Sequence, residues 1–146
     1  MRVLARFPRV RQFAKWAMTR IRRFQPLPDY DSPSNPGWLL LREIMRTWIE
    51  SADSPVLLVL LPLDSALKGL SDPSQYQARF RELCEETGCR LYDPLPELLK
   101  LPLRDRQLLW SDAYGHLSDQ GHAAVARLLT PVLESFMSKA PEEANY

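Results

Sequence analysis

The sequence predicts an α/β fold with a short parallel sheet, and three neighbouring segments carry that prediction. Residues 55–62 form a continuous apolar run between two prolines, which is typical of a strand buried on both faces. Residues 72–87 carry apolar side chains at helical spacing and end before Gly88, where a C-cap glycine is expected. Residues 89–92 form a second short strand. The order strand, helix, strand predicts a right-handed βαβ unit.

The residues before this unit predict two helices and a linker. Residues 1–25 hold eight Lys or Arg and no Asp or Glu, and apolar side chains recur every three or four residues. This pattern predicts a basic amphipathic helix that docks on a protein or lies on an anionic membrane surface. Residues 26–37 contain four prolines and predict a linker without regular structure. A second helical period runs through Trp38, Leu41, Ile44, Met45, Trp48 and Ile49.

The residues after the βαβ unit predict a loop and a last helix. Residues 95–110 are rich in Leu and Pro and predict a short helix followed by a loop. Ser118 or Asp119 is expected to cap the final helix, and Pro131 is expected to kink or split it. We therefore expect one α/β domain over residues 38–138 and a frayed tail over residues 139–146.

Composition narrows the function classes. No run of eighteen apolar residues exists, which argues against a membrane-spanning helix, and the cytoplasm is the default expectation. Residues 26–146 hold 18 Asp or Glu and only 11 Lys or Arg. An acidic surface of this kind repels phosphates, so no nucleic acid partner is expected. Cys84 and Cys89 are too few for a disulfide framework or a zinc site, and we expect reduced thiols.

Both histidines of the chain lie in one short segment near its C-terminal end. His116 and His122 are six residues apart, with Asp112 and Asp119 close by in the sequence. Loops at the carboxyl edge of a parallel sheet present functional side chains in α/β folds. A carboxylate in such a loop can hold the tautomer of an imidazole that takes a proton from a serine.

The same segment carries a family resemblance. Residues 112–122 read D-x-x-x-H-L-S-x-x-G-H and precede an Ala-, Val- and Leu-rich helix. This block resembles the final block of SGNH (GDSL-type) ester hydrolases, where an Asp and a His complete a Ser-His-Asp triad. The resemblance implies that Asp112 orients, that His116 is the general base, and that Gly121 and His122 are structural. It implies an ester-containing small molecule or carbohydrate as substrate, and no metal or organic cofactor.

The fold that the resemblance implies is a flavodoxin-like three-layer sandwich, of which residues 38–136 would form the C-terminal part. Three residues separate Asp112 from His116, whereas the family usually has two. The Gly-Asp-Ser block, the oxyanion glycine and the Gly-x-Asn-Asp block have no counterpart here. We therefore expect an incomplete domain that is inactive alone and self-associates through exposed sheet edges.

Several alternatives stay open at this stage. Ser65, in Leu-Asp-Ser-Ala-Leu, imitates the missing nucleophile block, but Asp64 or Ser65 capping a short helix is the simpler interpretation. Asp112 and His116 could instead bond only the backbone of an irregular loop. The two histidines lack the spacing of a zinc motif, which disfavours a metal site. The alternative function is a non-catalytic interaction module whose basic helix, residues 1–25, binds a partner or an anionic membrane.

Overall fold

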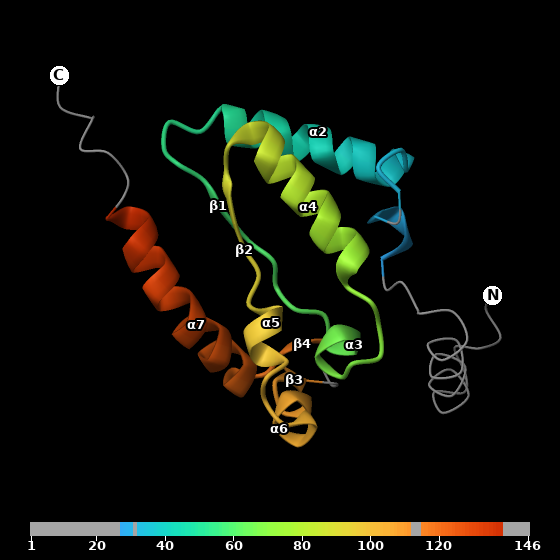
Figure 1. Ribbon diagram of the computed structural model, residues 1–146, viewed down its shortest axis with the longest axis vertical. Coiled ribbons are helices and arrows are strands. Elements are labelled where there is room, and N and C mark those ends of the chain that lie inside the picture. The colour runs from blue at the N-terminus through green and yellow to red at the C-terminus, as the bar shows by residue number, and fades with distance from the viewer. Residues whose placement is uncertain (1–26, 31, 112–114, 139–146) are drawn as a thin grey trace.

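The computed structural model describes residues 27–30, 32–111 and 115–138. The helices and strands are, in chain order, η2 (Pro28–Tyr30), α2 (Pro36–Glu50), β1 (Leu57–Val59), α3 (Asp64–Leu67), α4 (Ser74–Thr87), β2 (Arg90–Tyr92), α5 (Leu95–Leu98), α6 (Leu103–Gln107), β3 (Trp110–Ser111), β4 (His116–Leu117) and α7 (Asp119–Met137) (Figure 1). The predicted basic helix and the predicted frayed tail lie outside these residues. Within the described ranges, no helix has the length and apolar character needed to cross a membrane.

The predicted strand, helix and strand unit is present. Strands β1 and β2 pair in parallel, with Leu58 opposite Leu91, and α4 connects them. The helix ends at Gly88, which has a φ of 73° and donates its N–H to the carbonyl of Cys84 at 2.9 Å. Glycine reaches this left-handed conformation without a Cβ clash, which explains why the helix stops there. The chain is thus a mixed α/β protein.

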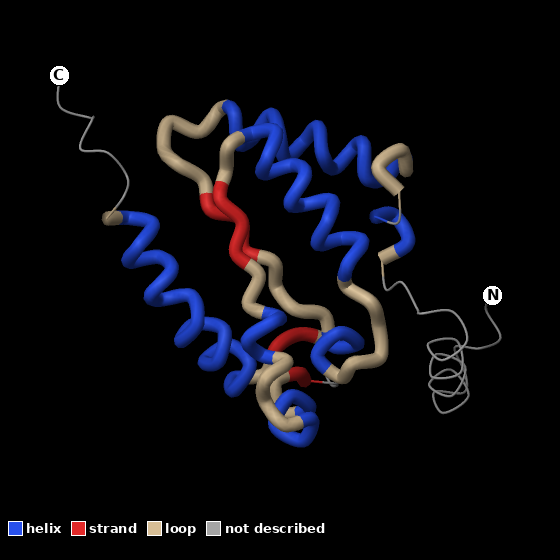
Figure 2. Tube along the Cα trace, viewed as in Figure 1, coloured by secondary structure: helices blue, strands red, loops and turns tan. Residues whose placement is uncertain are grey.

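Helices lie on both faces of the two-stranded sheet (Figures 1 and 2). Leu58 is buried among side chains of α2 and α4, and Leu91 packs against the same cluster. Arg90 and Tyr92, on either side of Leu91 in β2, point to the opposite face. There the Arg90 guanidinium lies 5.6 Å from the ring centroid of Phe136 in α7. The hydroxyl of Tyr92 donates to a carbonyl of α7 at 3.3 Å. Since successive strand residues alternate in direction, α7 covers one face while α2 and α4 cover the other.

A second cluster of buried side chains lies where the parallel strands end. Helices α3 and α5 follow β1 and β2 directly, so the carboxyl ends of both strands lead into this cluster. Its buried members are Ala66, Leu67, Leu95, Leu98, Leu109, Leu117 and Val125. Strand β4 and the first turns of α7 therefore pack at the carboxyl end of the parallel strands, where the sequence predicts the functional loop.

The predicted linker is partly structured. Tyr30, in η2, packs its ring against Trp38 and Phe80, with centroids 5.6 Å and 5.8 Å away. Helix α2 also begins earlier than predicted, because the Asn35 side chain accepts the N–H of Gly37 at 2.8 Å and caps it. The prediction of an irregular linker over residues 26–37 is therefore wrong for η2 and for the start of α2. The composition of residues 26–37 does not predict that Tyr30 packs against Trp38 and Phe80.

Two predictions about helices need correction. Trp38 and Ile49 are buried on α2, but Ile44 and Trp48 are 57% and 58% exposed, so the covered face is narrower than the periodicity implied. Helix α7 runs without interruption through Pro131, so Pro131 does not split it, and the predicted kink stays a prediction. Residues 95–110 form two short helices and one short strand where one helix and a loop were expected.

Candidate functional site

His116 lies on a β-hairpin that the sequence did not reveal. Strands β3 and β4 pair antiparallel, with Trp110 opposite Leu117 and Ser111 opposite His116. Gly115, with a φ of 70°, donates its N–H to the carbonyl of Ser111 at 2.9 Å and so returns the chain toward β4. Residues 112–114 lie outside the described residues, so the predicted pairing of Asp112 with His116 stays a prediction.

The imidazole of His116 is exposed and held through one of its nitrogens. Nδ1 lies 2.7 Å from the backbone carbonyl oxygen of Leu117. Because a carbonyl oxygen can only accept, this contact places the ring proton on Nδ1 and leaves Nε2 to accept a proton in the neutral imidazole. A general base needs this tautomer. The contact also fits the alternative interpretation, a histidine that only bonds the backbone of the hairpin.

Ser118 fixes the chain on the C-terminal side of His116. Its Oγ accepts the N–H of Gly121 at 3.1 Å, which confirms the predicted N-cap of α7. The same hydroxyl donates to the carbonyl of Leu108 at 2.6 Å. One side chain thus joins the start of α7 to the residues that lead into β3, and so braces the hairpin that carries His116.

Gly121 is required by a close backbone approach. A Cβ atom at this position would overlap the carbonyl oxygen of Leu109 and lie 3.0 Å from its carbonyl carbon. That carbonyl also accepts the backbone N–H of Ser118 at 3.0 Å. The predicted structural role of Gly121 agrees with this geometry, because the glycine allows α7 to start directly against the chain before β3.

His122 occupies the first turn of α7, and its side chain is exposed. The rings of His116 and His122 lie 6.5 Å apart between centroids, at an angle of 49°. The structural role that the resemblance implies for His122 stays a prediction, and an exposed side chain at this position does not serve buried groups. In the described part of the chain, no three His, Cys, Asp or Glu side chains gather in a group that could hold a metal ion.

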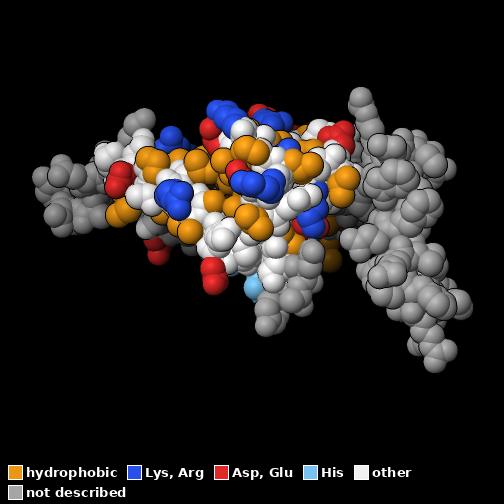
Figure 3. Space-filling view, turned by 90° about the horizontal axis from the view of Figure 1, so that it is seen from below, with side chains coloured by type: hydrophobic (Ala, Val, Ile, Leu, Met, Phe, Trp, Pro, Cys, Tyr) orange, Lys and Arg blue, Asp and Glu red, His pale blue; other side chains and the backbone are white. Residues whose placement is uncertain are grey.

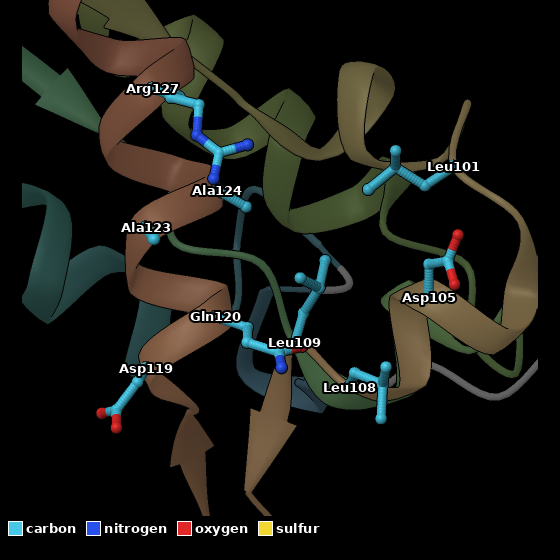
Figure 4. Close-up of a pocket in the computed structure, with 9 residues that line it drawn as sticks. All are labelled: Leu101, Asp105, Leu108, Leu109, Asp119, Gln120, Ala123, Ala124 and Arg127. Carbon is cyan, nitrogen blue, oxygen red and sulfur yellow. The ribbon is translucent and has the colours of Figure 1, made fainter.

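A cavity of about 490 Å³ lies between the residues around α6 and the first half of α7 (Figure 4). Its lining residues are Leu101, Asp105, Leu108, Leu109, Asp119, Gln120, Ala123, Ala124 and Arg127. Neither histidine belongs to this lining, so His116, the predicted base, does not line the cavity. Five of its nine lining residues are Leu or Ala, and the sequence pattern of residues 95–110 does not predict that the three leucines line a pocket.

Apolar side chains are exposed at this end of the molecule. Leu101, Leu103 and Leu108 are exposed around α6. Seen from below, apolar side chains alternate with Lys and Arg, and a histidine side chain reaches the surface (Figure 3). An exposed imidazole close to apolar surface is suited to a substrate that combines a polar reacting group with an apolar part.

Ser65 lies in the first turn of α3, and its Oγ is 2.8 Å from the Oγ of Ser71. Asp64 pairs with Lys68 at 2.7 Å, and the N-cap position belongs to Leu63, which has no side-chain oxygen. The prediction that Asp64 or Ser65 caps the helix is therefore wrong. Because α3 and β4 contribute to one buried cluster, Ser65 lies at the same end of the molecule as His116.

Comparisons with protein-family models, with curated proteins and with solved structures found no match for this chain. Any functional assignment therefore rests on the geometry of its own residues.

Proposed function

We propose that this chain is the acid/base segment of an SGNH-type ester hydrolase, with His116 as general base and Asp112 as its orienting partner. One observation carries the proposal: an exposed imidazole, with its Nδ1 held by a backbone carbonyl, stands on a braced hairpin at the carboxyl end of two parallel strands. This end of a parallel sheet is where α/β folds usually carry their sites.

The chemistry follows from the tautomer. A serine hydroxyl transfers its proton to Nε2 of His116 as its oxygen attacks the ester carbonyl, and the imidazolium later returns that proton to the leaving alcohol. The carbonyl of Leu117 keeps the Nδ1 proton in place, and the Asp112 carboxylate would stabilise the imidazolium. Because the sequence lacks a Gly-Asp-Ser block, the serine and the oxyanion donors come from another polypeptide segment.

Two surface features support a larger flavodoxin-like sandwich. The parallel sheet has two strands in the described ranges, so an edge of β1 has no strand beside it there. On α2, Leu40, Ile44 and Trp48 are spaced by four residues and are 66%, 57% and 58% exposed, which makes one apolar stripe. Open strand edges and apolar stripes are the surfaces on which further strands and helices pack.

Hydrolysis of p-nitrophenyl acetate tests the base. Because the chain lacks the serine of the triad, we expect only slow hydrolysis, in which the deprotonated imidazole activates water toward this reactive ester, and we expect His116→Ala to remove that slow reaction. His122→Ala is the matched control, since it removes a second exposed imidazole on the same surface and should keep the rate. Equal rates for the chain and for His116→Ala would end the version of the proposal in which the chain acts alone.

Ser65→Ala tests the source of the nucleophile. A nucleophile from another segment predicts that Ser65→Ala hydrolyses the ester at the rate of the unchanged chain. Loss of an initial burst of p-nitrophenol in this variant would instead identify Ser65 as the serine that is acylated. Mass spectrometry of the protein after a short reaction would then show whether an acetyl group is attached and where.

A second candidate function is the interaction module. The exposed stripe of α2 favours it, as does the charge of residues 1–25, which lie outside the described residues. Sedimentation with anionic vesicles, comparing the full chain with one that lacks residues 1–25, measures the membrane version of this function. Equal sedimentation of the two proteins would exclude residues 1–25 as a membrane anchor.

A further inference from the structure

The end of α4 and the start of β2 bring the two cysteines of the chain together. The Sγ atoms of Cys84 and Cys89 lie 2.7 Å apart, and both residues are free thiols. Gly88 makes the turn between them, and its N–H donates to the Cys84 carbonyl at 2.9 Å. The pair is therefore set by the βαβ unit itself, at the point where the crossover helix enters the second strand.

We infer that Cys84 and Cys89 form an oxidisable dithiol that closes to an intramolecular disulfide when glutathione disulfide is the oxidant. Thiols that already touch can bond without carrying any backbone segment across the molecule. The sequence predicts reduced thiols, which are the starting state of this oxidation.

The two sulfur atoms differ in access, which sets the order of steps. Cys84 is buried in the cluster that contains Trp38 and Leu58, whereas Cys89 is partly exposed. The thiolate of Cys89 therefore attacks glutathione disulfide first, so that a mixed disulfide forms and one glutathione thiolate leaves. The thiolate of Cys84 then attacks the Cys89 sulfur, the new bond closes, and the second glutathione thiolate leaves. The two protein protons end on the two glutathione molecules, and two electrons pass from the protein to glutathione.

Because Cys84 is buried, its thiol reacts slowly with dissolved glutathione disulfide. It reacts instead in the second step, with the mixed disulfide on Cys89. Burial, the hydrogen bond between the two sulfur atoms and the charge of Cys89 together raise the pKa of the Cys84 thiol to about 12. A thiol that stays protonated near neutral pH is a poor nucleophile toward a dissolved disulfide. Once Cys89 is in a mixed disulfide, its hydrogen bond and its charge no longer hold the Cys84 proton.

Peptide mass spectrometry tests the inference directly. Trypsin cleaves after Arg81 and Arg90, so both cysteines fall within one peptide, residues 82–90. After incubation of the folded chain with glutathione disulfide, we expect this peptide to lose the mass of two hydrogens and to resist alkylation. Reduced glutathione should restore both alkylation sites. A peptide that keeps two alkylatable thiols, or carries glutathione on both, would overturn the inference.

Single-cysteine variants separate the two roles. We expect Cys84→Ala to retain a stable glutathione adduct on Cys89, because the resolving thiol is missing. Cys89→Ala should keep its remaining thiol unmodified over the same time, because Cys84 is buried. Equal rates of adduct formation in the two variants would contradict the assigned order.

A thermal measurement checks the fold at the same time. The oxidised chain should unfold at a higher Tm than the reduced chain, since a disulfide restricts the unfolded ensemble, and Cys89→Ala should have one Tm in both buffers. A disulfide-linked dimer on a non-reducing gel, in place of an oxidised monomer, would count against an intramolecular bond.

Discussion

Within residues 116–122, the side chains that face inward and those that face outward are held by different forces. Leu117 is buried, the Ser118 hydroxyl makes two hydrogen bonds to backbone groups, and Gly121 lies against a carbonyl. His116 and His122 project from the same segment into solvent. Packing and hydrogen bonding explain the inward residues, whereas the exposed imidazoles contribute little to packing.

The inward and outward residues of this block therefore differ as evidence for function. A helix that starts against a strand needs a cap and a small residue three positions later, so Ser118 and Gly121 would suit many folds with this junction. The proposed function therefore depends on His116 and on Asp112. Variants along the segment should separate the two groups, with large effects on stability at inward positions and small ones at outward positions.

Gly121→Ala should have the largest effect. The added methyl group meets the Leu109 carbonyl, a backbone group that cannot turn away, and we expect a loss of about 3 kcal/mol in the free energy of unfolding. Urea denaturation measures it. Gly115→Ala is the control, because its Cβ would meet open space and the cost, about 1 kcal/mol, comes from the positive φ alone. Equal losses in the two variants would mean that α7 does not approach Leu109 as closely as described.

Ser118→Ala should come second. The variant loses the N-cap of α7 and leaves the Leu108 carbonyl without its donor, and we expect a loss of about 1 to 2 kcal/mol in unfolding free energy. Ser118→Asp can accept the Gly121 N–H but cannot donate to Leu108 when ionised, so it should recover only part of the loss. Full recovery by Ser118→Asp would show that the bond to Leu108 contributes nothing.

Sequence reasoning succeeded where the pattern is local. The apolar run of residues 55–62, the periodicity of residues 72–87 and the C-cap at Gly88 depend on neighbours in the chain, and the βαβ unit followed from them. Periodicity also grouped Trp38, Ile44 and Trp48 as helical. It could not say what covers each residue, because burial of Trp38 depends on Tyr30 and Phe80.

The candidate site was predicted less completely. The positions of Ser118 and Gly121 at the start of α7 agree with the prediction, because capping and glycine chemistry can be read from sequence. The hairpin was missed because its strands have two residues each, and such pairing depends on contacts with α7 more than on strand propensity. The cavity was missed because its two walls come from segments separated along the chain.

His116→Ala tests the outward group. We expect the unfolding free energy to change by no more than about 0.5 kcal/mol, since the ring is exposed. The same variant should lose the ester hydrolysis attributed to the imidazole. A loss of stability as large as that of Ser118→Ala would contradict this expectation. It would show that the contact of Nδ1 with the Leu117 carbonyl stabilises the fold.

His122→Ala should have the smallest effect of all. Its side chain is exposed on the first turn of α7, and the backbone N–H that bonds the Ser118 carbonyl at 2.8 Å remains in the variant. We therefore expect unchanged urea denaturation and unchanged ester hydrolysis. Because the two rings are 6.5 Å apart, a lower rate in His122→Ala would show that the imidazoles act as a pair, and the base would then have to be assigned to both histidines.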